Sequence, residues 1–225
     1  EDTEAFKALQ ESQDGEGSDQ PIAASPVVEA IRKYPKRIML AAGAFLSVQV
    51  TFYILIAFII AYGVTAPELA LSRDTMLTAV LIAAAIMVPS QFYFSGLSDR
   101  VGRKQIYRWG AILTGLWGFA LFPLINTGEP LMIVIAVTLG LTFLGMQYGP
   151  QAAYFTELFT TEVRYSGASL GYQIGAILGG ALAPTIAVLL WNELGIFYVS
   201  VYILVAAILT LLSLSALEET KGRTL

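Results

Sequence analysis

Long apolar runs alternate with short polar connections along most of this chain. The first run, "IMLAAGAFLSVQVTFYILIAFIIAY" at 38–62, contains no charged side chain. As an α-helix it would measure roughly 37 Å, which exceeds the roughly 30 Å of hydrocarbon in a bilayer. Five further runs of similar length follow. The pattern therefore predicts six membrane spans, at 38–62, 75–95, 107–125, 131–155, 167–190 and 197–217.

The spans are expected to be helices rather than strands of a barrel. Unpaired peptide groups in hydrocarbon cost several kcal/mol each, so a span must be helical or part of a closed barrel. The apolar runs are continuous, whereas barrel strands alternate over about ten residues. We expect an all-α polytopic membrane protein: a polar, largely mobile segment at 1–37 with a basic end, a six-helix bundle at 38–217 and a tail at 218–225.

The basic residues indicate the orientation of the bundle, because cytoplasmic connections carry an excess of Lys and Arg. Only Arg73 lies on the opposite side of the predicted spans, and Lys7 lies far out in the first segment. The sequence therefore predicts that both ends of the chain are cytoplasmic. The residues on that side are Arg32, Lys33, Lys36, Arg37, Arg100, Arg103, Lys104, Arg108, Arg164, Lys221 and Arg223.

Composition argues against most kinds of chemistry. The 225 residues are 56% hydrophobic and 13% charged, and they include neither His nor Cys. Disulfides, thiolate chemistry, haem, the usual zinc ligand sets and Ser-His or Cys-His pairs are thereby excluded. The net charge of −4 gives no reason to expect a nucleic-acid partner. We expect neither an enzyme nor a cofactor or metal site.

Three polar motifs lie at the predicted cytoplasmic side. The stretch "SGLSDRVGRK" at 95–104 resembles the G-x-L-a-D-R-x-G-R-K loop of the major facilitator superfamily, with Ser95 where that family usually has Gly. Glu157 and Arg164 are similar to its E-x6-R motif after the fourth helix of a half. The tail "LEETKGRTL" resembles P-E-T-K-G-R, with Glu218 in place of the proline.

The resemblance implies one half of a twelve-helix transporter. The opening "EDT" repeats the closing "EET", so the chain would begin at the end of a missing N-terminal half, and 1–37 would be the central cytoplasmic loop. The segment "TTEVRYSGASLGYQIGAILGGALAP" is similar to the metabolite:proton symporters. Proton-coupled symport of a small polar metabolite such as an organic acid, by alternating access in a bacterial inner membrane, is implied. The alternative is a non-transporting or channel-like membrane module.

The same resemblance implies a cytoplasmic network of ion pairs. Exposed pairs contribute only about 0 to 1 kcal/mol each, so such a network would bias a conformational equilibrium rather than hold the fold. The alternative is a solvated turn whose charges only set topology, and Lys104 is expected to be solvated. The expected network, with the surrounding block, comprises Asp99, Arg100, Gly102, Arg103, Glu157, Arg164 and Glu219.

The interior of the spans offers amides and phenols instead of charges. Apart from Arg108, at the start of the third span, no Asp, Glu, Lys or Arg lies within them. A proton-binding carboxylate is therefore expected in the absent half. The polar residues could line a substrate cavity or could bond helix to helix. The cavity candidates are Gln49, Tyr53, Gln91, Gln147, Gln151, Tyr154 and Gln173.

Small residues recur at every fourth position of the fifth span. A stripe of this kind allows two helix backbones to approach closely. Gln173, Ile177, Gly180 and Pro184 are expected on the opposite side, bordering the cavity. A homodimer seam along the stripe is the alternative. Pro89 and Pro150 predict kinks in the second and fourth spans. The stripe consists of Gly167, Gly171, Gly175 and Gly179, followed by Ala183.

Overall fold

All six predicted spans are helices in the computed structural model, which describes residues 26–222. Residues 1–25 of the polar first segment therefore lie outside the described residues. A short helix, α2 (Pro26–Lys33), precedes the bundle. The first span consists of α3 (Pro35–Tyr53), η1 (Ile54–Phe58) and α4 (Ile59–Thr65). The second, third and fourth spans are α5 (Arg73–Val101), α6 (Arg103–Ile125) and α7 (Pro130–Glu157). The fifth consists of α8 (Arg164–Gly175), η2 (Ala176–Ala181) and α9 (Ala183–Leu194), and the sixth is α10 (Ile196–Ala216).

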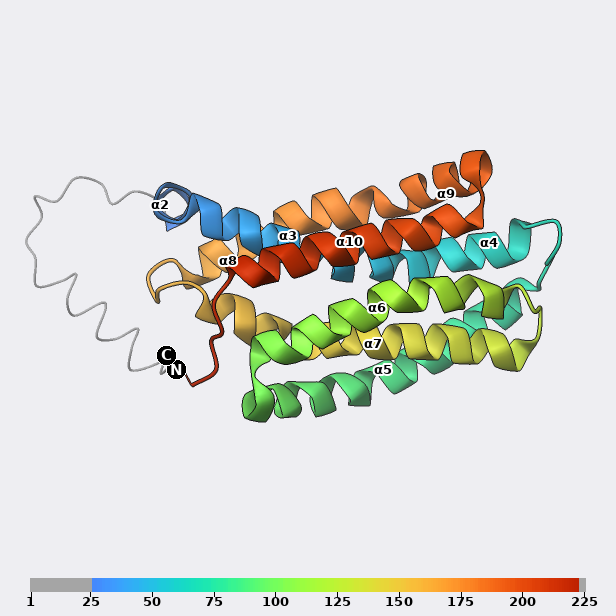
Figure 1. Ribbon diagram of the computed structural model, residues 1–225, viewed down its shortest axis with the longest axis horizontal. Helices are drawn as coiled ribbons and strands as arrows, with labels where there is room; N and C mark the ends of the chain where they lie inside the picture. The colour runs from blue at the N-terminus through green and yellow to red at the C-terminus, as the bar shows by residue number, and fades with distance from the viewer. Residues whose placement is uncertain (1–25, 223–225) are drawn as a thin grey trace, which may run out of the picture.

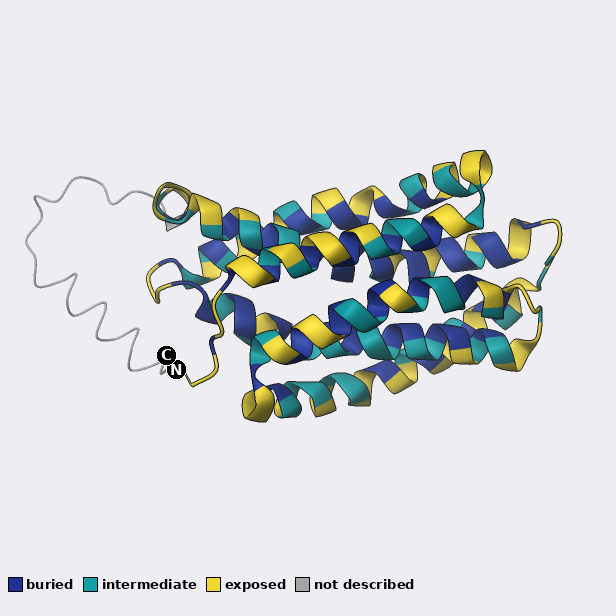
Figure 2. Cartoon of the chain, viewed as in Figure 1, coloured by how far each residue is buried: buried dark blue, intermediate teal, exposed yellow. Residues whose placement is uncertain are grey.

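The helices form one elongated bundle in which chain order differs from packing order (Figure 1). Helix α5 packs on α7, α7 on α6, α6 on α10, α10 on α3, and α3 on α8 and η2. The second and fifth spans therefore lie at the two flanks, and they are the least buried of the six. Figure 2 shows many exposed residues along α5 and α9, whereas α3 is mostly buried.

Local sequence explains where several helices begin and end. The Ser72 side chain accepts a hydrogen bond from the Thr75 amide at 3.0 Å and caps α5. Proline occupies the first turn of α3 and of α7, where its missing N–H costs nothing. Gly195, at φ 97°, separates α9 from α10 in a conformation that strongly favours glycine.

Hydroxyl groups tie the central helices together through backbone carbonyls. Tyr107 on α6 donates to the Ala44 carbonyl at 3.0 Å, and Thr210 on α10 lies 3.1 Å from the Gly43 carbonyl of α3. Ser200 on α10 donates to the Gly118 carbonyl of α6 at 2.6 Å. These bonds satisfy polar groups that are buried inside the bundle.

The glycine stripe of the fifth span lies against α3. A β-carbon at Gly171 would lie 2.8 Å from Ala41 Cβ, and one at Gly175 would lie 2.9 Å from the Ala42 carbonyl. A β-carbon at Gly179 would meet Gln49, whereas Gly167 faces Phe159. The stripe is therefore occupied within this chain, and the dimer-seam alternative finds no free surface there.

The expected position of Gly180 was wrong. It is buried, and a β-carbon there would lie 2.7 Å from the Tyr53 ring, on the same side as the stripe. The reason is η2, a π-helical segment, which has more residues per turn than an α-helix. This rotation brings Gly179 and Gly180 together onto α3, which a regular helical period does not predict. Gln173 and Ile177, by contrast, are exposed, whereas the stripe is buried.

Replacing Gly175 with Ala should lower the unfolding temperature of the protein in detergent by several degrees. Overpacking of this kind costs ~1–3 kcal/mol, because α8 must move away from α3. Gly96→Ala is the matched control, since a β-carbon at Gly96 meets nothing within 4 Å. Alanine also favours a helix over glycine, so the control should be neutral or slightly stabilising. Equal unfolding temperatures for the two variants would contradict this packing.

Candidate functional site at the charged end of the bundle

The charged block at 95–104 is a junction between two helices. The spans predicted at 75–95 and 107–125 leave a connection between them, but α5 continues to Val101 and α6 begins at Arg103, so only Gly102 is not helical there. Gly102 has φ 132° and ψ 137°. This conformation is rare for residues with a side chain, and a β-carbon would also lie 2.8 Å from Glu219 Oε2. A glycine is therefore required where the chain reverses.

Arg103 connects the ends of two other helices through two carboxylates. Its Nη1 lies 2.9 Å from Asp99 Oδ1 on α5, and its Nε lies 2.8 Å from Glu157 Oε2 at the end of α7. The Glu157 side chain is 6% exposed and the Asp99 side chain 59%. Glu157 Oε2 has no hydrogen bond of regular geometry, so its attraction to Arg103 is mainly Coulombic. The pair with Glu157 is the better shielded of the two.

Glu219 joins this cluster through backbone amides rather than through a guanidinium group. Its Oε1 accepts from the amides of Arg103 at 3.0 Å and Lys104 at 3.3 Å, in the first turn of α6. The same oxygen accepts from the amides of Thr220 and Lys221 in the tail. A carboxylate at a helix N-terminus satisfies free N–H groups and complements the helix dipole. The tail thus caps α6.

Further contacts hold the tail across the end of the bundle. Lys104 Nζ donates to the Leu217 carbonyl at 2.5 Å, so Lys104 is not merely solvated as we expected. Lys221 Nζ donates to the Arg100 carbonyl at the end of α5. The Tyr154 hydroxyl donates to the Glu218 carbonyl at 3.0 Å. The last turns of α5, α7 and α10 are joined in this way to the start of α6.

Two expected members of the network make no ion pair among the described residues. The Arg164 Nη2 group lies 3.5 Å from Thr161 Oγ1, and its Nε is buried without a hydrogen-bond partner. The Arg100 side chain is on the exposed surface, and only its backbone carbonyl takes part, through Lys221. The structure therefore brings Asp99, Arg103, Glu157 and Glu219 together and leaves both arginines outside the cluster.

Three of the predicted cavity residues are buried glutamines with an unpaired amide atom. Gln147 Nε2 donates to Thr114 Oγ1 at 3.1 Å, whereas its Oε1 is buried without a partner. Gln151 Oε1 and Gln49 Nε2 are also buried without a hydrogen-bond partner among the described residues. Buried polar atoms are almost always bonded, so unpaired ones need an explanation such as a ligand.

The other predicted cavity residues occupy different positions. Tyr154 is fully buried and points to the tail, so it is part of the charged end rather than of a cavity. Gln91 is half-buried and packs against α7, where a β-carbon at Gly149 would lie 2.7 Å from its carbonyl. Tyr53 and Gln173 are exposed on α3 and α8.

A cavity of about 260 Å³ lies between α3, α7 and α8. Gln151 and Gln173 line it together with the aromatic rings of Phe45 and Tyr172. The rings of Phe45 and Phe155 stack at 4.1 Å, and Tyr172 meets Phe45 edge to face at 5.3 Å. We did not single out these aromatic residues from the sequence, because an aromatic side chain in a span is indistinguishable from ordinary core.

These features define a polytopic membrane protein whose six spans are tied together at one charged end. Residues 4–170 match the model of the Major Facilitator Superfamily. The chain belongs to this superfamily of membrane transporters.

Curated relatives agree with this assignment. The inner membrane metabolite transport protein YhjE of Escherichia coli K12 is 34% identical over 89% of this chain and 50% of its own length. The shikimate transporter of the same organism is 29% identical over 76% of this chain and 41% of its own length. Its proline/betaine transporter is 27% identical over 88% and 39%. The chain thus spans about half the length of the curated relatives it matches, or less.

A double-mutant cycle should rank the two pairs of Arg103. We expect the coupling free energy of Arg103→Gln with Glu157→Gln to be ~1–2 kcal/mol, because that pair is shielded from water. The cycle of Arg103→Gln with Asp99→Asn is the internal control. It should give less than ~1 kcal/mol, since Asp99 is exposed. Unfolding of the purified protein in detergent provides the measurement, and a larger coupling for Asp99 would contradict the arrangement.

Proposed function

We propose that this chain is the C-terminal six-helix half of a twelve-helix secondary transporter. The whole protein would carry a small polar metabolite, such as an organic acid, together with protons across a bacterial inner membrane. Membership of the superfamily and the names of the relatives support transport. The gathering of basic residues at one end of the bundle supports cytoplasmic termini, by the positive-inside tendency.

The unpaired amides of Gln49, Gln147 and Gln151 carry the proposal of a polar substrate. They lie on α3 and α7, inside a bundle whose buried side chains are mostly apolar and aromatic, with some Ser and Thr hydroxyl groups among them. Amides can donate to carboxylates and accept from hydroxyls, which suits a small organic acid. The aromatic walls of the adjacent cavity would exclude water around such a molecule.

The distribution of charged residues supports a proton-binding site in the other half. Among the described residues, Asp, Glu, Lys and Arg lie only near the ends of the six spans. A proton carrier at membrane depth would therefore be a carboxylate supplied by a preceding six-helix half. The same applies to a cation that anchors an anionic substrate.

Alternating access would use the charged end and the two π-helical segments. The Arg103 pairs and the tail cap hold the ends of α5, α6 and α7 together, so these helices would move as one body. Segments η1 and η2 interrupt the first and fifth spans, and they pack on α9 and α3 respectively. Because π segments bring weaker, rearranged backbone bonds, they are suitable places for these spans to bend.

Transport by the full-length protein can be tested in proteoliposomes. Labelled organic acids should accumulate when the outside is more acidic than the inside and should exchange by counterflow without a gradient. Uptake that does not depend on the pH gradient would contradict proton coupling but would still support transport. The absence of counterflow for every candidate acid would argue for a non-transporting module.

Substitution of Gln151 by Ala should raise the KM for the transported acid about three- to tenfold, because the variant loses one hydrogen bond to the substrate. The maximal rate should change less than KM. Gln105→Ala is the matched control, since Gln105 is exposed in the first turn of α6 and does not line the cavity. An unchanged KM for the Gln151 variant would remove this residue from the substrate site.

A further inference from the structure

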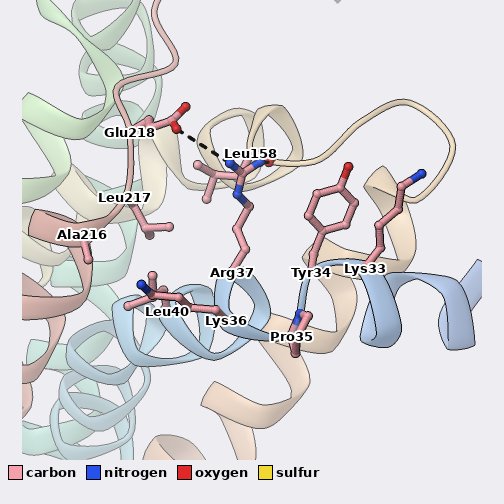
Figure 3. Close-up of a pocket in the computed structure, with 10 residues that line it drawn as sticks. All are labelled: Lys33, Tyr34, Pro35, Lys36, Arg37, Leu40, Leu158, Ala216, Leu217 and Glu218. Atoms are coloured by element: carbon pink, nitrogen blue, oxygen red, sulfur yellow. Dashed lines mark hydrogen bonds and ion pairs between the residues drawn. The ribbon is translucent and has the colours of Figure 1, made fainter.

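A second cavity, of about 290 Å³, lies at the charged end of the bundle, where α2 turns into α3 (Figure 3). The turn is formed by Tyr34 and Pro35, and the ends of α7 and α10 close the cavity. This place is separate from the Gln151 cavity and shares no lining residue with it.

The cavity carries a surplus of positive charge. Lys33, Lys36 and Arg37 line it, and Glu218 is the only acidic residue of its lining within residues 26–222. Arg37 donates through Nη1 to the Leu158 carbonyl at 2.7 Å, and its Nη2 lies 3.7 Å from Glu218 Oε1. This second contact is long and half-exposed, so it binds the carboxylate weakly. The guanidinium group therefore keeps capacity for another anion.

The two lysines differ in their surroundings. Lys33 Nζ lies 3.6 Å from Glu162 and 3.5 Å from Glu29, and these carboxylates raise the pKa of Lys33. Lys36 is exposed and takes part in no ion pair within residues 26–222. Lys36 is thus the cation of this cavity that is available to a ligand without displacing a carboxylate.

Part of the lining of the same cavity is apolar and consists of Leu40, Leu158, Ala216 and Leu217. Tyr34 lies beside Arg37, with its ring 5.6 Å from the Arg37 guanidinium carbon (Figure 3). A ligand that fills this space must combine an anionic head with apolar groups. A free inorganic anion would leave the apolar lining without a partner.

The cavity lies at the level of the bilayer surface. The apolar run of the first span begins at Ile38, directly after Lys36 and Arg37. Helix α2 is seen nearly end-on in Figure 1, so it runs across the bundle axis as an interfacial helix does. Three of its apolar side chains, those of Val27, Val28 and Ile31, are exposed beside the exposed Arg32 and Lys33. An exposed apolar face beside lysines and arginines is typical of a helix lying on an anionic leaflet.

We propose that this cavity binds the phosphate and glycerol backbone of an anionic phospholipid, with Lys36 and Arg37 at the phosphate and the leucines under the glycerol. The proposal requires the membrane-spanning fold and is independent of the transported substrate. Glu218 competes with the lipid for Arg37 and so limits the affinity of the site.

The experiment is a titration of the full-length protein, in a non-ionic detergent, with short-chain phosphatidylglycerol, read out by native mass spectrometry. Lys36→Gln should weaken binding about fivefold, the effect of one basic residue at an anionic lipid surface. Arg108→Gln is the matched control, because Arg108 is an exposed cation near the same end of the bundle that lines no part of the cavity. It should leave the affinity unchanged.

A variant that binds the lipid more tightly tests the proposal in a way that a folding defect cannot imitate. Glu218→Gln removes the competing carboxylate and should bind phosphatidylglycerol several-fold more tightly than the unmodified protein. Weaker binding by this variant, or equal losses in the Lys36 and Arg108 variants, would overturn the proposal. Binding of phosphatidylcholine as tight as that of phosphatidylglycerol would also overturn the proposal. Effective competition by inorganic phosphate or glycerol phosphate would assign the site to a soluble phosphate and not to a lipid.

Discussion

Close contact between helix backbones is the constraint on which this structure depends. In a bilayer, apolar side chains gain nothing by leaving lipid for protein, so helices associate through close packing and through polar bonds between them. Glycines supply that contact at several crossings: Gly171 and Gly175 against α3, Gly149 against α5, and Gly115 against α10. Hydroxyl bonds to backbone carbonyls, such as that of Ser200 to Gly118, are possible because the backbones are already near.

The same requirement for partners organises the charged end. Six spans bring several helix termini to one side, each with free backbone groups. The tail satisfies part of this need, since one carboxylate oxygen of Glu219 accepts the first amides of α6 and two amides of the tail itself. Arg103 then joins α5 to α7 through Asp99 and Glu157. Helices that are distant in the chain thus end in one connected cluster, and they can respond together to a conformational change.

The middle of the bundle is organised differently, because strong polar contacts are few there. Amide atoms of Gln49, Gln147 and Gln151 have no hydrogen-bond partner in the part of the chain that the structure describes, and two π-helical segments break the regular bonding of the first and fifth spans. A rigid, cross-linked end and a less tightly bonded middle are what a protein requires if its halves rock around a central site. The proposed lipid cavity adds a third level, at which the bilayer surface would hold α2 and the start of α3.

Sequence by itself determined the number of spans and the side of the bundle that gathers charge, whereas several helices extend beyond the predicted bounds. Those properties follow from hydrocarbon thickness and from the cost of burying charges, which act on each segment separately. The stripe of Gly171 and Gly175 was also evident, because its spacing is helical. The motifs identified Asp99, Arg103, Glu157 and Glu219 as members of one cluster, although not the atoms through which each one binds.

Only the tertiary structure decided which partner each polar group finds. Gly180 lies with the stripe because a π segment shifts the helical period, and no local signal in the sequence marks that shift. Within residues 26–222 Arg164 makes no ion pair, and Lys104 donates to the Leu217 carbonyl because the tail passes across the end of the bundle. Partners separated by more than a hundred residues depend on how the helices pack, and that packing is a property of the whole bundle and not of any one span.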